Sequence, residues 1–141
     1  MTHPIASAAN RAARKSVLVV EDNALERFVL SEWLRHSSYR VVEAGTADEA
    51  IEVLASSLGI HAVVTDMQMP GEAQGLDLVR HIRKVYPHIY VIGVSANDFK
   101  LELELEMCPF FIKPYDLGEI TSLLATSLKD SRPGDDIQEI A

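Results

Sequence analysis

The amino-acid sequence predicts an α/β fold, a five-stranded parallel sheet with helices on both faces. Short runs rich in β-branched residues alternate along the chain with segments of helical periodicity, which is the pattern of strands joined by crossover helices. Three of these runs are apolar nearly throughout, as strands are when helices cover both sides of a sheet. The 141 residues, 48% of them hydrophobic and 24% charged, suffice for one domain with a sizeable core.

Each element can be assigned from its own pattern. The predicted strands are 17–20 (VLVV), 39–44 (YRVVEA), 62–66 (AVVTD), 90–95 (YVIGVS) and 110–112 (FFI). Thr46 with Glu49 and Asp116 with Glu119 form capping boxes, each just before an apolar helical stripe. Two further helices are predicted from apolar residues at helical spacing, namely Leu25, Phe28, Val29, Trp33 and Leu34 in the first, and Leu78, Val79 and Ile82 in the other. Segment 101–107 (LELELEM) alternates with period two, yet its place between two parallel strands favours a short, unusual helix.

The domain is predicted to span residues 16–129, with disordered arms at 1–15 and 130–141. No further domain is expected, so the chain is interpreted as a stand-alone domain. No apolar run could cross a bilayer, and the single cysteine, Cys108, cannot form an internal disulfide, so a cytoplasmic protein is expected. The net charge of −8 argues against direct binding to nucleic acid or to an anionic membrane.

Polar side chains stand where the predicted strands end. Glu21 and Asp22 follow the first strand, Asp66 ends the third, Ser95 ends the fourth and Lys113 follows the fifth. In an open parallel sheet these ends meet at one edge, where such folds bind their ligands. The sequence therefore predicts three carboxylates, a hydroxyl and an ammonium around one crevice.

This set of groups favours metal-assisted phosphoryl chemistry. Three converging carboxylates repel one another, and a hard divalent cation such as Mg²⁺ or Mn²⁺ removes that cost. An aspartate beside a cation, a lysine and a hydroxyl donor can act as a nucleophile toward a phosphoryl group. The expected product is an aspartyl phosphate on Asp66, with Lys113 and Ser95 stabilising the transferred group.

Each residue also has a simpler interpretation when it is considered alone. Asp22 could cap the first helix, Glu21 could be a solvated loop carboxylate, and Asp66 could be a turn residue before the Pro-Gly that follows. Ser95 could cap a helix start, and Lys113 could be a surface lysine. Their joint placement at successive strand ends favours the site over these separate roles.

These motifs resemble the receiver domain of two-component response regulators, the chemotaxis-regulator type with a flavodoxin-like doubly wound fold. The resemblance covers about residues 16–128 and rests on VLVVEDN, VVTDMQMPG, VIGVSA and FFIKPYD. It implies phosphorylation of Asp66 and a switch formed by Ser95 and by Phe110, which alone could equally be strand core. It also implies a cis bond between Lys113 and Pro114.

The resemblance further implies a magnesium site and predicts where this chain departs from its relatives. Mg²⁺ is expected on Asp22, Asp66 and the backbone carbonyl of Gln68, with Glu21 acting through water. Glu21 replaces a frequent Asp, segment 70–75 (PGEAQG) is one residue longer than usual, and the stretch between Ser95 and Lys113 is shorter than usual. The last departure affects the fourth helix and the surface through which receivers usually contact their targets.

The sequence thus predicts a stand-alone phosphoacceptor with at most slow self-phosphorylation and self-dephosphorylation. The expected partners are a histidine kinase or histidine phosphotransfer protein and an unknown downstream protein, with the chain a monomer or a phosphorylation-dependent homodimer. One alternative is a receiver-like module that binds proteins without phosphorylation. Another is a haloacid-dehalogenase-type phosphatase, but Gln68 stands where that family needs a second acid.

Overall fold

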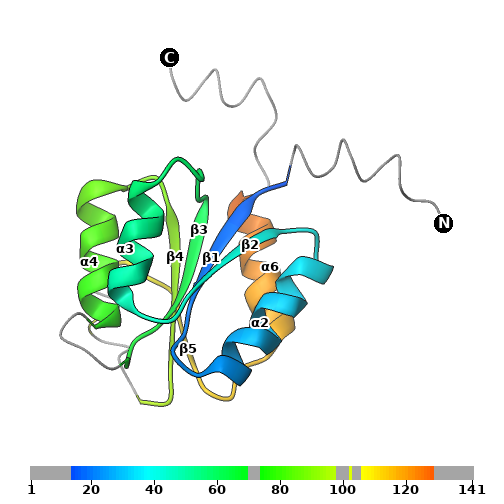
Figure 1. Cartoon of the computed structure of the whole chain (residues 1–141). Coiled ribbons are helices and arrows are strands. Elements are labelled where there is room, and N and C mark those ends of the chain that lie inside the picture. The colour runs from blue at the N-terminus through cyan, green and yellow to red at the C-terminus, as the bar shows by residue number, and fades with distance from the viewer. Residues whose placement is uncertain (1–13, 70–73, 98–101, 103–105, 129–141) are drawn as a thin grey trace.

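The computed structural model describes residues 14–69, 74–97, 102 and 106–128 (Figure 1). Five strands form one parallel sheet in the order β2-β1-β3-β4-β5, which confirms the predicted fold class. The strands are β1 (Ser16–Val20), β2 (Arg40–Ala44), β3 (Ala62–Asp66), β4 (Tyr90–Ser95) and β5 (Phe110–Ile112). All five coincide with the predicted segments to within one residue at each end.

Helices cover both faces of the sheet. The helices of the described residues are α2 (Ala24–His36), α3 (Ala47–Ala55), α4 (Gly75–Val85) and α6 (Leu117–Leu128). In Figure 1, α3 and α4 lie on one face of the sheet, and α2 and α6 lie on the other. The chain crosses from one face to the other between β1 and β3, so the ends of these two strands flank the crevice that doubly wound folds use for ligands.

Two hydrophobic clusters hold the three layers together. Every residue of β1 and β3 is buried, and alternate side chains of these strands point to opposite faces. One cluster packs β-strand residues such as Leu18 and Val63 against α3 and α4. The other packs Val19 and Val64 against α2 and α6. The two strands that carry the predicted carboxylates, β1 and β3, are therefore buried along their whole length.

The first turn of each helix is fixed by local hydrogen bonds. Asn23 caps α2 by accepting the Glu26 N–H at 2.9 Å, and Thr46 caps α3 by accepting the Glu49 N–H at 3.0 Å. Gln74 and Asp77 form a reciprocal capping box at α4. At α6 the Asp116 carboxylate accepts the Gly118 N–H at 2.7 Å. The capping residues Thr46 and Asp116 were predicted from the sequence.

Helix α2 forms as predicted, but most of its predicted apolar stripe does not face the core. Of its five members only Leu34 is buried, whereas Leu25 is 70% exposed and Phe28 is 58% exposed. The face that packs on the sheet is formed by Leu30, Ser31 and Leu34. The apolar side chains of α2 therefore lie on two sides of the helix, and one side faces solvent.

Helix α4 begins in direct contact with the backbone of β3. A Cβ atom added at Gly75 would lie 2.3 Å from the Asp66 carbonyl oxygen and 2.5 Å from the Met67 Cα. No other residue type fits without displacing the strand or the helix. Gly75 thus allows the helix to start against the residue that the sequence singles out as phosphoacceptor.

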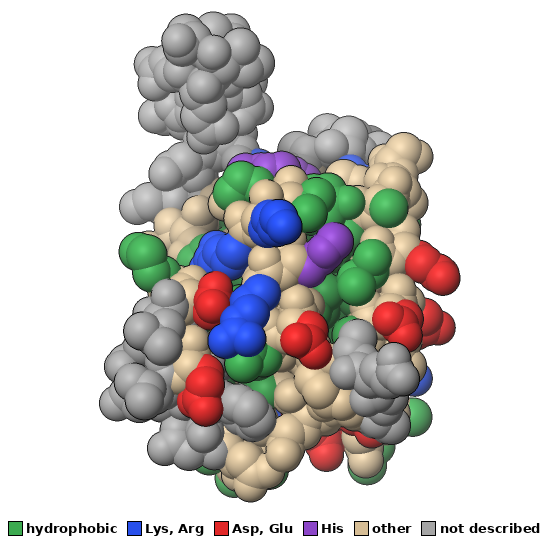
Figure 2. Space-filling view, turned by 90° about the vertical axis from the view of Figure 1, so that its left-hand side faces the viewer, with side chains coloured by type: hydrophobic (Ala, Val, Ile, Leu, Met, Phe, Trp, Pro, Cys, Tyr) green, Lys and Arg blue, Asp and Glu red, His purple; other side chains and the backbone are tan. Residues whose placement is uncertain are grey.

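The outer side of α4 is basic and holds the chain that leads into β5. Figure 2 shows Lys and Arg side chains gathered on this face, with Asp and Glu around them. Arg80 forms an ion pair with Glu106 at 3.1 Å, and Arg83 donates to the carbonyl oxygens of Glu106 and Met107, both at 3.0 Å. Most of the predicted helix at 101–107 lies outside the described residues. The same holds for residues 70–73 of the predicted long loop and for the predicted arms, except residues 14 and 15.

Candidate functional site

Three carboxylates converge at the carboxyl ends of β1 and β3. Glu21 and Asp22 directly follow β1, Asp66 is the last residue of β3, and the two strands are neighbours in the sheet. One oxygen from each of Glu21, Asp22 and Asp66 lies within 4.8 Å of the others. Glu21 and Asp66 are each 5% exposed, whereas Asp22 is open to solvent. The structure therefore brings together the three acidic residues predicted from the sequence.

Lys113 completes the centre of this cluster from β5. Its Nζ donates to Glu21 Oε1 at 3.0 Å and to Asp66 Oδ2 at 3.1 Å. Its backbone N–H donates to the Ser95 carbonyl oxygen at 2.8 Å, which fixes the start of the loop after β5 to the end of β4. The peptide bond between Lys113 and Pro114 is cis, as predicted. The ammonium thus lies between the carboxylates of the two central strands.

The electrostatics of the cluster favour a further cation. Burial, opposed by hydrogen bonds from Lys113 and from the Asn23 N–H, raises the pKa of Glu21 to about 7. Burial tends to lower the pKa of Lys113, but the hydrogen bonds that it donates to carboxylates outweigh burial and raise the pKa above its usual range. One ammonium therefore does not fully compensate the acidic groups, and the donor set of carboxylate oxygens suits a hard divalent ion.

The polar rim of the site is formed by residues that follow β3 and β4. The Gln68 N–H donates to Asp66 Oδ1 at 3.0 Å, and the Asn97 side-chain amide donates to the Gln68 side-chain oxygen. Ser95 is fully buried, and its hydroxyl oxygen accepts the Asn97 N–H at 3.1 Å. Because the oxygen is the acceptor there, the hydroxyl proton can be donated to another group. Gln68 and Ser95 thus lie at the ends of β3 and β4, beside Asp66 and Asn97 respectively, and their predicted roles stay predictions.

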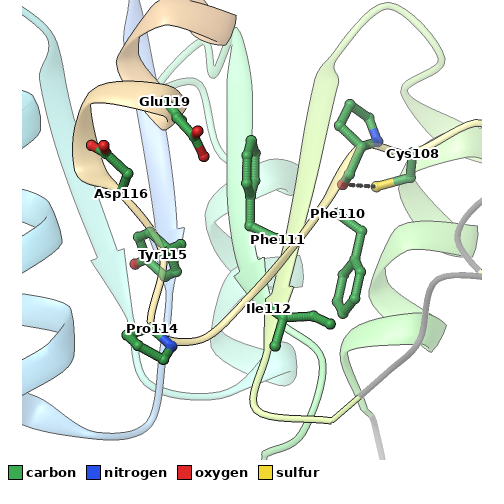
Figure 3. Close-up of a pocket in the computed structure, with 9 residues that line it drawn as sticks. Cys108, Phe110, Phe111, Ile112, Pro114, Tyr115, Asp116 and Glu119 are labelled. Atoms are coloured by element: carbon green, nitrogen blue, oxygen red, sulfur yellow. Dashed lines mark hydrogen bonds between the residues drawn. The ribbon is translucent and has the colours of Figure 1, made fainter.

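Phe110 is separated from the carboxylates and belongs to the edge of the sheet. Figure 3 shows Phe110 and Phe111 on opposite sides of β5, and the two rings pack in the two different hydrophobic clusters. Phe110 is partly buried, beside a hollow that is also lined by Cys108, Ile112 and Tyr115. Burial raises the pKa of the Cys108 thiol to about 11, so it remains protonated. The position fits either a switch residue or a strand core residue.

Glu26 was not predicted from the sequence as a residue of the site. Glu26, in the first turn of α2, accepts a hydrogen bond from Lys113 Nζ through its Oε1 at 2.6 Å. This is the shortest of the three contacts of the Lys113 ammonium with carboxylates. A side chain in the first turn of a helix leans back toward the strand end before it, but nothing in the sequence pairs Glu26 with Lys113.

Comparison with known proteins agrees with this geometry. Residues 17–125 match the family described as the response regulator receiver domain. The two-component response regulator ORR3 of Oryza sativa is 38% identical over 113 residues, which cover 76% of this chain and 86% of that protein. The sensor protein TorS of Escherichia coli is 32% identical over 99 residues, which cover 68% of this chain but only 11% of TorS.

A solved structure shares the fold. The response regulator TrrA of Thermotoga maritima, determined in complex with Mg²⁺-BeF, superposes with a TM-score of 0.72 at 24% sequence identity. The match covers 80% of this chain and 98% of that chain.

No described helix combines the length and apolarity needed to span a membrane. From its sequence match and its parallel sheet of matching topology, the chain belongs to the response regulator receiver domain family.

Proposed function

We propose that the protein is a phosphoacceptor of a two-component system, in which Asp66 receives a phosphoryl group from a histidine kinase or a histidine phosphotransfer protein. The observation that carries this proposal is the contact of the Lys113 ammonium with both Asp66 and Glu21, inside a cluster of three carboxylates. Receiver domains are the part of response regulators that accepts phosphate, and the match covers the residues concerned.

The proposed transfer needs no other nucleophile. One Asp66 carboxylate oxygen attacks the phosphorus atom of a phosphohistidine, a P–O bond forms, and the P–N bond breaks. The imidazole leaves with the electron pair of the broken bond and is protonated. Lys113 and the Ser95 hydroxyl stabilise negative charge on the phosphoryl oxygens.

Mg²⁺ is the cofactor proposed for this site. Asp22, Asp66 and the Gln68 carbonyl would hold it, with Glu21 acting through water, and it would neutralise charge on the phosphoryl oxygens. The residues present fit such an ion, because oxygens of the three carboxylates lie within 4.8 Å of one another and burial makes Glu21 hard to ionise without a cation. TrrA, a structural relative, has been seen with Mg²⁺-BeF.

The phosphodonor protein is proposed to contact α2. A donor histidine must come within bonding distance of Asp66, so the protein that carries it must cover the rim of the site. Leu25, Phe28 and Val29 are exposed on α2, and Leu25 and Val29 line a hollow that extends to Lys113. Exposed apolar side chains beside a reactive centre are typical of a protein-binding surface.

The chain is proposed to act through contacts with other proteins. We further propose that it is not an enzyme beyond slow self-phosphorylation and self-dephosphorylation. Phosphorylation would shift a population of conformations through Ser95 and Phe110 and so change affinity for a downstream protein, or favour a homodimer.

The first test compares the unmodified chain with Asp66→Asn. Each is incubated with acetyl phosphate and Mg²⁺, and intact mass is measured. We expect the unmodified chain to gain one phosphoryl group and Asp66→Asn to gain none, because an amide cannot replace the nucleophilic carboxylate. Asp48→Asn, an exposed residue of α3, serves as the matched control and should behave like the unmodified chain.

The alternatives give different results in the same experiment. An unmodified chain that gains no mass while it still binds a partner would support the phosphorylation-independent module. An equal gain in Asp66→Asn would contradict the assignment of Asp66. Sustained release of phosphate from phosphate esters would support the phosphatase alternative.

A further inference from the structure

Glu26 is bound to the site in a way that its local sequence does not explain. It stands three residues after the N-cap Asn23, a position where a glutamate normally reaches back to the backbone N–H of the cap. Here the Asn23 N–H instead donates to Glu21 Oε2 at 3.1 Å. The Glu26 carboxylate therefore lacks its usual partner and contacts Lys113 Nζ at 2.6 Å.

In α3 and α4 the equivalent acidic residue turns back to the backbone at the start of its own helix. Asp77 accepts the N–H of the cap Gln74 at 3.0 Å, and Glu49 accepts the N–H of Gly45, the residue before the cap Thr46. Among these three helices, α2 is the one in which the third residue of the first turn, Glu26, contacts Lys113. The difference follows from Glu21, two residues before the cap, which already accepts the Asn23 N–H.

The contact has consequences for any phosphoryl group on Asp66. Lys113 Nζ is shared by Glu21, Asp66 and Glu26 at 3.0, 3.1 and 2.6 Å. A phosphoryl oxygen must take one of these places, and Glu26 is the partner on the solvent side, with 49% of its side chain exposed. It also adds a negative charge on the path by which an anionic donor approaches.

We propose that Glu26 is a positioning residue of this site, and that its carboxylate competes with the incoming phosphoryl group for the Lys113 ammonium. In the unphosphorylated protein Glu26 draws Lys113 toward α2, and the transfer of phosphate to Asp66 breaks this link between β5 and α2. This inference rests on the proposed function of Asp66. Its test therefore includes one measurement that requires no phosphorylation.

The first measurement is the affinity for Mg²⁺, determined by calorimetry. Without the Glu26 charge, Lys113 stays closer to Glu21 and Asp66 and opposes the cation. We expect Glu26→Gln to weaken Mg²⁺ binding about three- to fivefold, the size of an exposed ion-pair effect. In a protein that already carries Lys113→Gln, the same substitution should change the Mg²⁺ affinity less than about twofold. There the Glu26 charge can act only directly, over a longer distance, on the bound cation.

The second measurement is the initial rate of phosphorylation by acetyl phosphate. We expect Glu26→Gln to raise this rate about three- to fivefold at low ionic strength, and the gain to shrink at about 0.5 M salt, where exposed charges are screened. Phosphoramidate, which carries one negative charge fewer, should show a smaller gain. A purely structural role of Glu26 would give neither the salt dependence nor the donor dependence.

Glu32→Gln is the matched control, because Glu32 lies on the same helix, pairs with Arg35 and has a similarly exposed side chain. We expect it to change neither quantity by more than about twofold. Equal loss of Mg²⁺ affinity in both Lys113 backgrounds, or an unchanged phosphorylation rate in Glu26→Gln, would overturn the inference. An unmodified chain that gains no phosphoryl mass would instead contradict the proposed function, and the Mg²⁺ measurement would still decide on Glu26.

Discussion

Helices α2 and α3 begin with the same kind of capping hydrogen bond, but the glutamate of the first turn has a different partner in each. Each has a capping side chain, Asn23 or Thr46, that accepts the N–H of a glutamate three residues later. Glu49 then reaches back and closes its own helix start, whereas Glu26 reaches the Lys113 ammonium. In this chain, the first-turn glutamate that reaches the site is at the helix start where Glu21 already accepts the N–H of the cap.

A third helix start, that of α4, allows the largest test of this comparison. We expect Gly75→Ala to lower the free energy of unfolding by about 3 kcal/mol, because its Cβ would lie 2.3 Å from the Asp66 carbonyl oxygen. Gly45→Ala, next to the start of α3, is the control, since its Cβ would meet only side-chain atoms at 3.6 Å. Urea denaturation measures both. Equal stability of the two variants would mean that α4 can move away from β3 at little cost.

Glu21, which accepts the Asn23 N–H at the start of α2, is also expected to act in metal binding. The pH dependence of stability and of Mg²⁺ affinity tests this role of Glu21. Burial raises the pKa of Glu21 from 4.5 to about 7, so the folded metal-free protein retains a proton that the unfolded chain releases. The free energy of unfolding without metal should therefore fall as the pH rises from 4.5 to about 7. Since Mg²⁺ competes with this proton, its affinity should rise with pH by up to tenfold per unit below about 7 and then level off.

Calorimetric Mg²⁺ titrations at about pH 6 and about pH 8 measure this effect. Glu21→Gln should remove most of the dependence, because the amide does not titrate in this range. Glu32→Gln should retain it. Identical affinities of the unmodified protein at both pH values would show that Glu21 does not control metal binding.

The smallest expected effect concerns the two capping side chains. We expect Asn23→Ala and Thr46→Ala each to lower the free energy of unfolding by about 1 kcal/mol, because each removes the acceptor for one helix N–H. Neither should alter Mg²⁺ affinity by more than about twofold, since Glu21 is held by the backbone of Asn23. Thermal unfolding and calorimetry provide the two readouts. A loss of Mg²⁺ affinity in Asn23→Ala alone would assign a role in the site to its side chain.

The sheet could be predicted from the sequence because its central strands are buried on both faces. In β3 and β4 nearly every residue is apolar or buried, so the runs that mark these strands are continuous, and both matched their predicted bounds. The clustering of Asp66 with Glu21 and Lys113 follows from strand ends meeting at one edge of a parallel sheet. These relations depend on the order of elements and require no knowledge of individual side-chain contacts.

The surface of α2 and the role of Glu26 could not be predicted in the same way. Phe28 and Leu34 are both apolar, but one is exposed and the other is buried, and composition alone does not separate a binding surface from a core. Glu26 follows the ordinary pattern of a capping box. Its actual partner, Lys113, lies 87 residues further along the chain, so only the assembled fold identifies the contact.

The contacts of Lys113 have a consequence for the order of events during synthesis and folding of the chain. They join residues separated by 92, 87 and 47 positions, so the ammonium meets its carboxylates only after nearly the whole domain has been synthesised. Contacts over such long chain segments carry a loop-closure cost and form late in folding. A nascent chain that ends before β5 contains Asp66 without its lysine. Under the proposed function, Asp66 would therefore gain its lysine only at the end of folding, and an incomplete chain would lack the complete site.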